Sequence, residues 1–261
     1  MAISTFKRYE IKFLLSEHQF RELSDILPKY MNPDAYCQDG KTYSIYNIYY
    51  DTPDNNLIRT SLFGPYYKEK LRLRSYAPSA GASDRVFLEL KKKTGGIVHK
   101  RRATMTLKEA NEFLLSGKQP KSDKYIDRQV ENELAYFLSF NPVQPTTYIS
   151  YRRMAFFGKD DCEFRLTLDQ NITTRRDHLQ LSAGNFGEKL LEPGCHLMEV
   201  KITGAMPLWL AEFLSEIKVY KTSFSKYGME YKNYCAEQKR DHSVFTPNGV
   251  VALYPKICVS A

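Results

Sequence analysis

The sequence predicts an α+β protein in which antiparallel strands curl into a barrel with a charged interior, flanked by amphipathic helices. Three observations support this prediction. Several short stretches alternate charged and apolar residues with the period of two that a β-strand requires. Stretches with helical spacing of apolar residues lie between them and need an apolar sheet face to cover. The charged rows are rich in arginine, and each carries one carboxylate among its cations.

The composition is that of a folded globular protein with a basic surface. The chain has 261 residues, of which 43% are hydrophobic and 26% charged, so a disordered chain is excluded. The net charge is +8 and the isoelectric point is near 9.1, which predicts a polyanionic partner. Net charge alone does not choose among nucleic acid, phosphates and an anionic membrane.

The five cysteines are scattered and form no CxxC pair, which argues against a zinc knuckle or a redox motif. The N-terminus lacks the apolar core of a signal peptide, and no apolar run approaches the length of a membrane span. These features predict a cytoplasmic protein with reduced thiols and no membrane segment of its own.

The first half of the chain contains most of the cationic strands. Residues 6–15 are expected to form a strand, and Ser16 is expected to cap a helix over 16–30. A tyrosine-rich strand follows and ends at a turn over 51–54, after which a short helix precedes Gly64-Pro65. Residues 70–102 are organised as successive strands, with Thr94-Gly95-Gly96 as a hairpin turn.

The second half alternates helices and strands. Thr106 and Glu109 form a capping box that opens a helix ending near Gly117. A helix over 127–140 precedes strands over 146–157 and 162–175, an exposed loop over 177–188 and a strand over 195–204. Amphipathic helices are expected over 206–219 and from about Lys226 to Gln238. We expect one domain over residues 1–240 and a tail over 241–261 whose role the sequence does not define.

An acid-x-base alternation recurs on separate strands and has two interpretations. It occurs as Glu10-Ile-Lys12, Glu89-Leu-Lys91 and Glu199-Val-Lys201, with Glu163-Phe-Arg165 as a variant. Strands with one solvated face would produce it through cross-strand ion pairs. A barrel with a charged lumen would produce it too, if metal and a polyanion offset the buried charges. The arginines favour the lumen, because their donor fork suits bidentate phosphate binding.

Seven motifs, in order, resemble one known family: RYEIKFLL, KLRLRSY, FLELKK, YRRMAF, FRLTLDQNI, MEVKITG and FSKY. Together they are similar to the vacuolar transporter chaperone (VTC) domain over residues 6–235. This domain is the polyphosphate-polymerase branch of the triphosphate tunnel metalloenzymes, which are relatives of the CYTH proteins. The resemblance implies an eight-stranded antiparallel β-barrel that forms a tunnel lined by basic residues.

The resemblance also implies roles for individual residues. Catalytic contacts to the transferred phosphoryl group are expected from Arg72, Arg74, Lys91 and Lys201. Other substrate contacts are expected from Lys12, Lys100, Arg153, Arg165, Ser225 and Lys226. Glu199 is expected to hold Mn²⁺ or Mg²⁺, with Glu10, Glu89 and Glu163 as possible helpers. Tyr227 flanks the last of these lysines.

The implied function is a metal-dependent transfer of the ATP γ-phosphoryl group to polyphosphate or inorganic phosphate. A triphosphate hydrolase on the same barrel and a non-catalytic polyanion-binding module remain alternatives. No nucleic-acid-binding motif is present, and a membrane partner stays open. The chain departs from the superfamily signature ExExK, because Arg8 stands where the first glutamate would be. Ser223 stands where a basic residue is expected, with Lys221 close enough to substitute.

Overall fold

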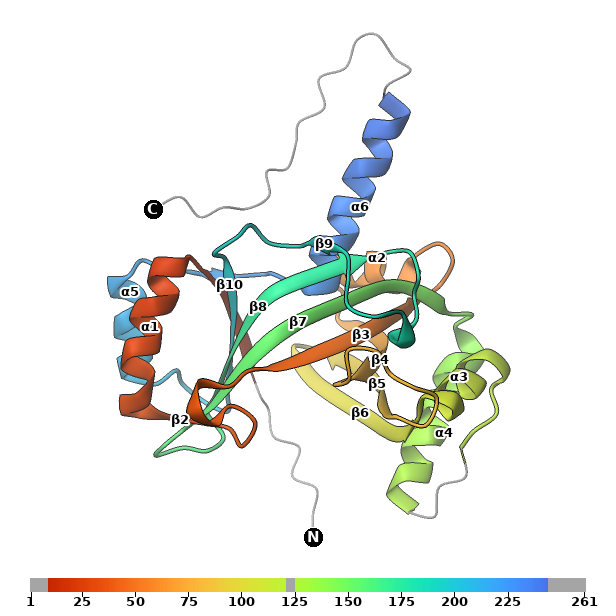
Figure 1. Cartoon of the computed structure of the whole chain (residues 1–261), viewed down its shortest axis with the longest axis horizontal. Helices are drawn as coiled ribbons and strands as arrows, with labels where there is room; N and C mark the ends of the chain where they lie inside the picture. The colour runs from red at the N-terminus through yellow and green to blue at the C-terminus, as the bar shows by residue number, and fades with distance from the viewer. Residues whose placement is uncertain (1–8, 121–124, 244–261) are drawn as a thin grey trace.

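The computed structural model describes residues 9–120 and 125–243, and the side chains of these residues up to 239 (Figure 1). The strands are β1 (Tyr9–Leu15), β2 (Met31–Pro33), β3 (Tyr43–Asp51), β4 (Tyr67–Ser75), β5 (Arg85–Thr94), β6 (Ile97–Thr106), β7 (Gln144–Gly158), β8 (Arg165–Arg175), β9 (Glu188–Lys189), β10 (His196–Ile202) and β11 (Lys221–Thr222). The helices are α1 (Glu17–Tyr30), α2 (Asn56–Leu62), α3 (Leu107–Ser116), α4 (Tyr125–Phe140), α5 (Leu208–Glu216) and α6 (Lys226–Ser243), with short 3₁₀ turns at Gln38–Gly40 and Leu181–Ala183.

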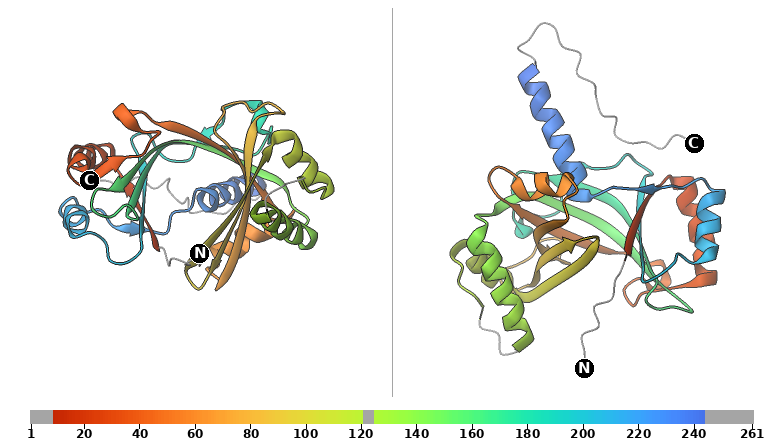
Figure 2. Two further views of the ribbon diagram at one scale, coloured as in Figure 1. Left: turned by 90° about the horizontal axis from the view of Figure 1, so that it is seen from below. Right: turned by 180° about the vertical axis from the view of Figure 1, so that it is seen from behind.

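All described strands belong to one antiparallel sheet, which curls into a deep trough. The strand order is β11-β1-β10-β8-β7-β3-β4-β5-β6, with β2 added beside β7 and β9 beside β8. Seen from below, the sheet forms two facing walls, and the first turn of α6 lies between them (Figure 2).

The predicted closed barrel of eight strands differs from this sheet in two respects. The described sheet has eleven strands, and its edges β11 and β6 are not paired with each other. Side chains connect the walls instead, since Lys91 Nζ of β5 lies 3.4 Å from Glu10 Oε2 of β1. This ion pair links the two walls on the strands next to the unpaired edges of the sheet.

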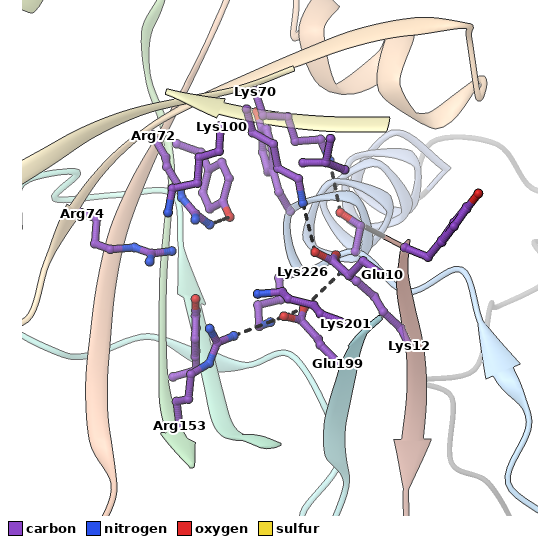
Figure 3. Close-up of a pocket in the computed structure, with 17 residues that line it drawn as sticks. Glu10, Lys12, Lys70, Arg72, Arg74, Lys100, Arg153, Glu199, Lys201 and Lys226 are labelled. Atoms are coloured by element: carbon purple, nitrogen blue, oxygen red, sulfur yellow. Dashed lines mark hydrogen bonds and ion pairs between the residues drawn. The ribbon is translucent and has the colours of Figure 1, made fainter. Parts of the chain in front are cut away.

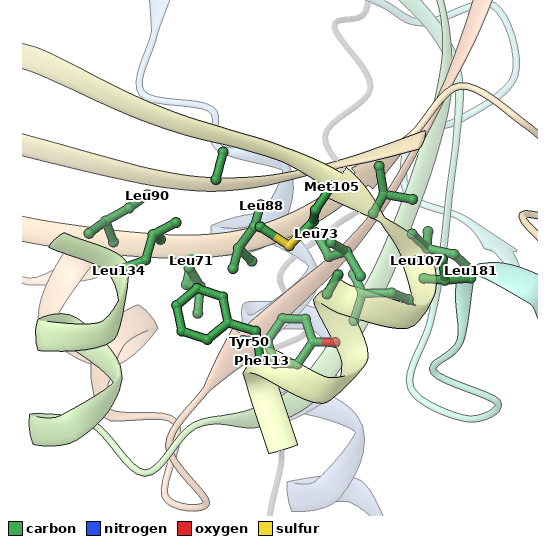
Figure 4. Packing of buried hydrophobic residues seen from close by; sticks show 14 of the residues in the cluster. Tyr50, Leu71, Leu73, Leu88, Leu90, Met105, Leu107, Phe113, Leu134 and Leu181 are labelled. Carbon is green, nitrogen blue, oxygen red and sulfur yellow. The ribbon is translucent and has the colours of Figure 1, made fainter. Parts of the chain in front are cut away.

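The apolar faces of the strands point outward and are covered by helices, as predicted. Helices α3 and α4 pack against β4, β5 and β6, where Leu71, Leu88 and Phe113 are fully buried (Figure 4). Helices α1 and α5 cover the opposite side around Met198 and Val200. Each fully buried side chain of this size contributes roughly 1.5–3 kcal/mol to folding. Helical cover on the convex face leaves the concave face for the charged rows.

Several predicted local signals are confirmed. Ser16 caps α1 in a capping box with Gln19, and Thr106 caps α3 in a capping box with Glu109. Gly117 ends α3 in the left-handed conformation with φ of 72°. Gly95 has a positive φ in the tight turn between β5 and β6, and a Cβ there would meet the ring of Tyr66 at 3.0 Å. The local sequence therefore defines the ends of these elements.

Other predictions need correction or fall outside the described residues. The segment 177–188 is not simply an exposed loop, because Leu181 is buried in the core and Glu188 starts β9. Arg8, the first residues of the predicted strand and residues 244–261 of the tail lie outside the described part. Among the described residues, no helix is both long and apolar enough to cross a membrane.

Candidate active site

A cavity of about 410 Å³ opens on the concave face of the sheet (Figure 3). Nine cationic side chains and two carboxylates line it, which gives a formal excess of seven positive charges. The cations are Lys12, Lys70, Arg72, Arg74, Lys91, Lys100, Arg153, Lys201 and Lys226; the carboxylates are Glu10 and Glu199; Tyr9, Tyr49, Val98, Tyr151, Ser225 and Tyr227 complete the lining. Such a cavity fits a small ligand with several negative charges.

Strand alternation and register bring these side chains together from seven strands and one helix. On β1 and β10, Lys12 lies opposite Glu199 and Glu10 lies opposite Lys201, so the two acid-x-base motifs form complementary pairs. The remaining lining comes from β3, β4, β5, β6 and β7. Ser225 and Lys226 enter at the beginning of α6, whose N-terminal amide groups favour an anion.

Glu89 anchors the side chains of one wall of the cavity. Its side chain is 1% exposed and does not line the cavity. Arg72 Nε lies 2.7 Å from Oε2, while Lys100 Nζ and Arg102 Nε lie 2.9 and 2.6 Å from Oε1; Arg74 is 3.6 Å away. Burial would raise the pKa of Glu89, but these cations hold it far below its usual value. Four cations engage the carboxylate that the sequence suggested as a metal helper, and it orders Arg72 and Arg74.

Asp169 anchors the other wall, and the sequence prediction missed it. This carboxylate is fully buried on β8 and accepts two hydrogen bonds from Arg153, at 2.6 and 2.7 Å. Lys226 Nζ lies 2.5 Å from the same carboxylate and 3.1 Å from Glu199 Oε1. The alternation of β8 contained a signal, because Leu166 and Leu168 point to the core and Asp169 therefore points to the concave face.

The sequence matches the family model of the VTC domain over residues 7–234. The chain belongs to the VTC domain family. No curated protein gives a match. Among solved structures, the chain resembles an adenylate cyclase candidate from Bacillus halodurans, with 16% identity and a TM-score of 0.50, covering 84% of this chain and 95% of that one. It also resembles an adenylyl cyclase candidate from Hippeastrum described as having a dominant triphosphatase activity, with 20% identity and a TM-score of 0.50, covering 87% and 96%.

These two neighbours share the fold with this VTC domain, and at such low sequence identities the likeness shows the fold alone. The resemblance noted from the seven sequence motifs is confirmed by the family match. The family assignment therefore rests on the VTC model, and the basic cavity lies within the matched residues.

Glu199 and Glu10 are the carboxylates of this VTC domain that fit a divalent cation. Lys12 Nζ lies 3.4 Å from Glu10 and 3.2 Å from Glu199, and Arg153 lies 3.3 Å from Glu199. Burial would raise the pKa of both carboxyl groups, but the neighbouring lysines and Arg153 lower it, to about 2 for Glu10 and further for Glu199. Both are therefore anionic at neutral pH and suited to a cation.

A metal held by the protein alone does not fit this donor set. Within the described residues, no group of three or more His, Cys, Asp or Glu side chains is arranged to hold a metal ion. Mg²⁺ commonly uses one or two carboxylates together with substrate phosphates and water. The residues therefore fit an ion that Glu199 and Glu10 would hold jointly with phosphate oxygens.

Two lysines of the cavity have no described carboxylate within ion-pair distance. Lys70 donates to Ser225 Oγ at 3.2 Å, and Lys201 has no described salt bridge. Burial, together with Lys12, Lys91 and other cations, lowers the pKa of Lys70 to about 7. Burial and Arg153 also lower the pKa of Lys201. Both effects follow from a cavity that holds more positive charge than its own carboxylates offset.

The lining also contains residues that were not among the predicted site residues, namely Lys70, Val98, Tyr9, Tyr49 and Tyr151. Tyr49 accepts a hydrogen bond from Arg72 Nη1 at 3.2 Å and stacks on Tyr227 at 4.8 Å. Tyr227 donates to Asp51 Oδ2 at 2.8 Å, and Asp51 in turn accepts from the backbone amides of Leu57 and Ile58 at the start of α2. Tyr49 is buried and also orients an arginine.

Some predicted residues do not join the cavity. Arg165 is exposed at the start of β8 and does not line it, and Glu163 lies in the preceding turn. Lys221 and Ser223 are exposed and do not line it either, so Lys221 does not replace a missing cation there. These residues lie at or beyond the ends of their strands. Alternation predicts which face of a strand a side chain occupies, but not whether that position reaches the cavity.

Proposed function

We propose that this VTC domain is a metal-dependent polyphosphate polymerase that transfers the γ-phosphoryl group of ATP to a polyphosphate end or to inorganic phosphate. The observation that carries the proposal is the cavity with nine cations, two carboxylates and ordered arginines. Its charge suits a triphosphate better than a neutral or singly charged metabolite, because buried cations without partners are costly. The family match supports the same substrate class.

In this proposal the protein acts by positioning and by electrostatic stabilisation. Phosphoryl transfer requires little covalent chemistry from the enzyme, since an oxygen of the acceptor attacks Pγ in line while the bond from Pγ to the bridging oxygen breaks and ADP leaves. Arg72 and Arg74, held in place by Glu89, would bind oxygens of the transferred group. Arg153 and Lys226, held by Asp169, would bind phosphates from the opposite wall.

Glu199, with Glu10, would hold Mn²⁺ or Mg²⁺, and the ion would supply positive charge to offset that of the phosphates. The acceptor in this reaction is already an anion, so it needs no strong general base. This agrees with the lining, in which no histidine occurs among the described side chains. His18, His99, His178 and His196 lie elsewhere, and His242 falls outside the described side chains.

The test is synthesis of polyphosphate by the purified protein from ATP with Mn²⁺ or Mg²⁺, resolved on a polyacrylamide gel. Glu199→Gln should lower chain synthesis by about 100-fold or more, as expected for loss of one stabilising group in the transition state. Glu212→Gln, on the exposed face of α5, removes the same charge far from the cavity and should leave synthesis unchanged. A chelator should abolish synthesis by the wild-type protein.

The products distinguish the alternatives. Long chains that form only with metal and with Glu199 support the polymerase. Release of inorganic phosphate without chains would replace it with a triphosphate hydrolase. Binding of tripolyphosphate without turnover, and without dependence on metal, would leave a polyanion-binding module.

A further inference from the structure

The inward face of the β4–β5 hairpin carries an unusual ladder of like charges. Lys70 lies directly opposite Lys91, and Lys68 lies directly opposite Lys93. Like charges at directly opposed positions destabilise an antiparallel pair. We define these four residues as the lysine ladder. The inner pair lines the cavity, and the outer pair lies two residues further along the same face, toward the β5–β6 turn at Gly95.

The ladder contrasts with the other charged pairs on these two strands. Arg72 lies opposite Glu89 at 2.7 Å on the same inward face. On the outward face, Glu69 lies opposite Lys92 at 3.7 Å. The other directly opposed charged residues of β4 and β5 therefore have opposite signs. Only the lysine ladder places like charges opposite each other.

The ladder has almost no anionic partner within the described chain. Lys91 reaches Glu10 at 3.4 Å, whereas Lys70 donates to Ser225 Oγ and Lys68 donates to the backbone oxygen of Ser61 at 3.1 Å. No described carboxylate lies within ion-pair distance of Lys93. All four side chains are half-buried, so water screens their repulsion only in part. Burial and the neighbouring Lys93 and Lys91 lower the pKa of Lys68, which agrees with an uncompensated positive row.

A ligand of regularly spaced negative charge would remove this repulsion. Two residues along a strand correspond to about 6.7 Å, so the outer pair extends the basic lining by that distance beyond the inner pair. The outer pair does not line the cavity, so a compact triphosphate bound in the cavity would not contact it. A longer phosphate chain, leaving the cavity along β4 and β5, would reach it.

We propose that the lysine ladder is a chain-binding track, which binds the phosphates of polyphosphate outside the cavity and thereby discriminates long chains from triphosphate. This proposal rests on the proposed function for its biological ligand. The track itself can be tested by binding alone, without turnover.

The experiment measures the affinity of the full chain for two probes, tripolyphosphate and size-fractionated long-chain polyphosphate, at fixed salt. The double variant Lys68→Ala/Lys93→Ala removes the outer pair and leaves the cavity lining intact. We expect it to weaken binding of the long chain by roughly three- to thirtyfold, the range of two partly exposed ion pairs. Binding of tripolyphosphate should stay within about twofold of wild type, because only screened charge is lost.

A matched control is Lys108→Ala/Lys118→Ala, which removes two exposed charges from the α3 region, away from the cavity. It should change neither affinity by more than about twofold. The single reversal Lys93→Glu should weaken the long chain further than Lys93→Ala. Lys68 and Lys93 both lie outside the buried core. Unchanged binding of tripolyphosphate by their variants will show that the cavity remains folded.

Unchanged affinity for the long chain in the double variant would overturn the track. Equal weakening of both probes would also overturn it, since this would show only general attraction by net charge. The outcome is independent of catalysis. If the wild-type protein makes no polyphosphate from ATP but the double variant binds the long chain more weakly, the track is supported and the polymerase proposal fails. If the wild-type protein makes polyphosphate but the double variant binds the long chain as tightly as wild type, the polymerase is supported and the track fails.

Discussion

The most informative perturbation of this protein is Glu89→Gln, which keeps the shape of a buried side chain and removes its charge. The wild-type carboxylate is 1% exposed and lies within 3.6 Å of four cations. The variant leaves Arg72 and Arg74 without a compensating carboxylate, in a cavity wall that already carries excess positive charge. Breaking a buried ion pair from one side typically costs about 3–5 kcal/mol.

This cost converts to a large change in thermal stability. For a protein of this size each kcal/mol shifts the melting temperature by roughly 2–4 °C, so a decrease of about 6–20 °C is expected. The matched control is Glu133→Gln on α4, whose carboxylate pairs with Lys92 and Arg101 at 2.8 and 2.9 Å on the outward face. That side chain is more exposed, and its loss should cost about 1 kcal/mol or less.

Tripolyphosphate provides the second part of the assay. A ligand that binds only the folded state stabilises it in proportion to its affinity. If Glu89 holds arginines that face a phosphate ligand, the anion replaces part of the lost charge in Glu89→Gln. The ligand should therefore raise the melting temperature of the variant more than that of wild type. A decrease equal to that of Glu133→Gln, or no additional stabilisation by the ligand, would refute this explanation.

The pH dependence of stability tests the role of Glu89 without a ligand. The pKa of Glu89 in the folded protein lies far below its usual value near 4.5, because Arg72, Arg74 and Lys100 outweigh the effect of burial. The stabilisation by this carboxylate is therefore complete above the unfolded pKa and decreases as pH falls toward the folded pKa. The gap between wild type and Glu89→Gln should stay constant above about pH 5 and narrow in acid.

Four further predictions concern the cavity. Burial and neighbouring cations lower the pKa of Lys70 to about 7 and that of Lys100 to about 8, so tripolyphosphate binding at pH 8 should take up protons; calorimetry in buffers of different ionisation enthalpy measures this uptake, and Lys70→Met should reduce it. Because folding disfavours the charged form of Lys70, this side chain destabilises the ligand-free protein below pH 7, and the effect disappears above about pH 10.5. Lys70→Met should therefore raise the melting temperature at pH 6 and leave it unchanged at high pH. Tyr227→Phe removes a hydrogen bond to buried Asp51 and should cost about 1–3 kcal/mol in denaturant unfolding; a change below a few tenths would contradict the link to α2. Glu10→Gln should raise the Mn²⁺ concentration for half-maximal synthesis by roughly tenfold while chains still form, and an unchanged metal requirement would exclude Glu10 as a ligand.

Much of the fold followed from local sequence signals. The capping boxes at Ser16 and Thr106, the glycine stop at Gly117 and the hairpin turn at Gly95 are confirmed because each depends on a few consecutive residues. Alternation along one strand also separates Arg152 from Arg153: Arg153 lines the cavity, and Arg152 binds Thr42 at the surface.

The sequence was less informative about the partners of each inward residue. It suggested Glu89 as a metal helper and Arg165 as a phosphate ligand, whereas Glu89 is buried and engaged by four cations and Arg165 is exposed. It did not give the partners of Arg175 and Arg176 at the end of β8. Arg175 is buried and stacks on Tyr148 at 3.6 Å, and Arg176 binds Glu230 at 2.7 Å.

The sequence by itself determined which residues form strands and which face of each strand is charged, because a period of two is a local property of the backbone. It also carried the family motifs. Only the tertiary structure decided that Asp169 and Glu89 hold the arginines, that Lys68 and Lys70 face Lys93 and Lys91, and that an ion pair connects the walls near the sheet edges. Those contacts depend on the register and twist of strands far apart in the chain, which a one-residue shift would change completely.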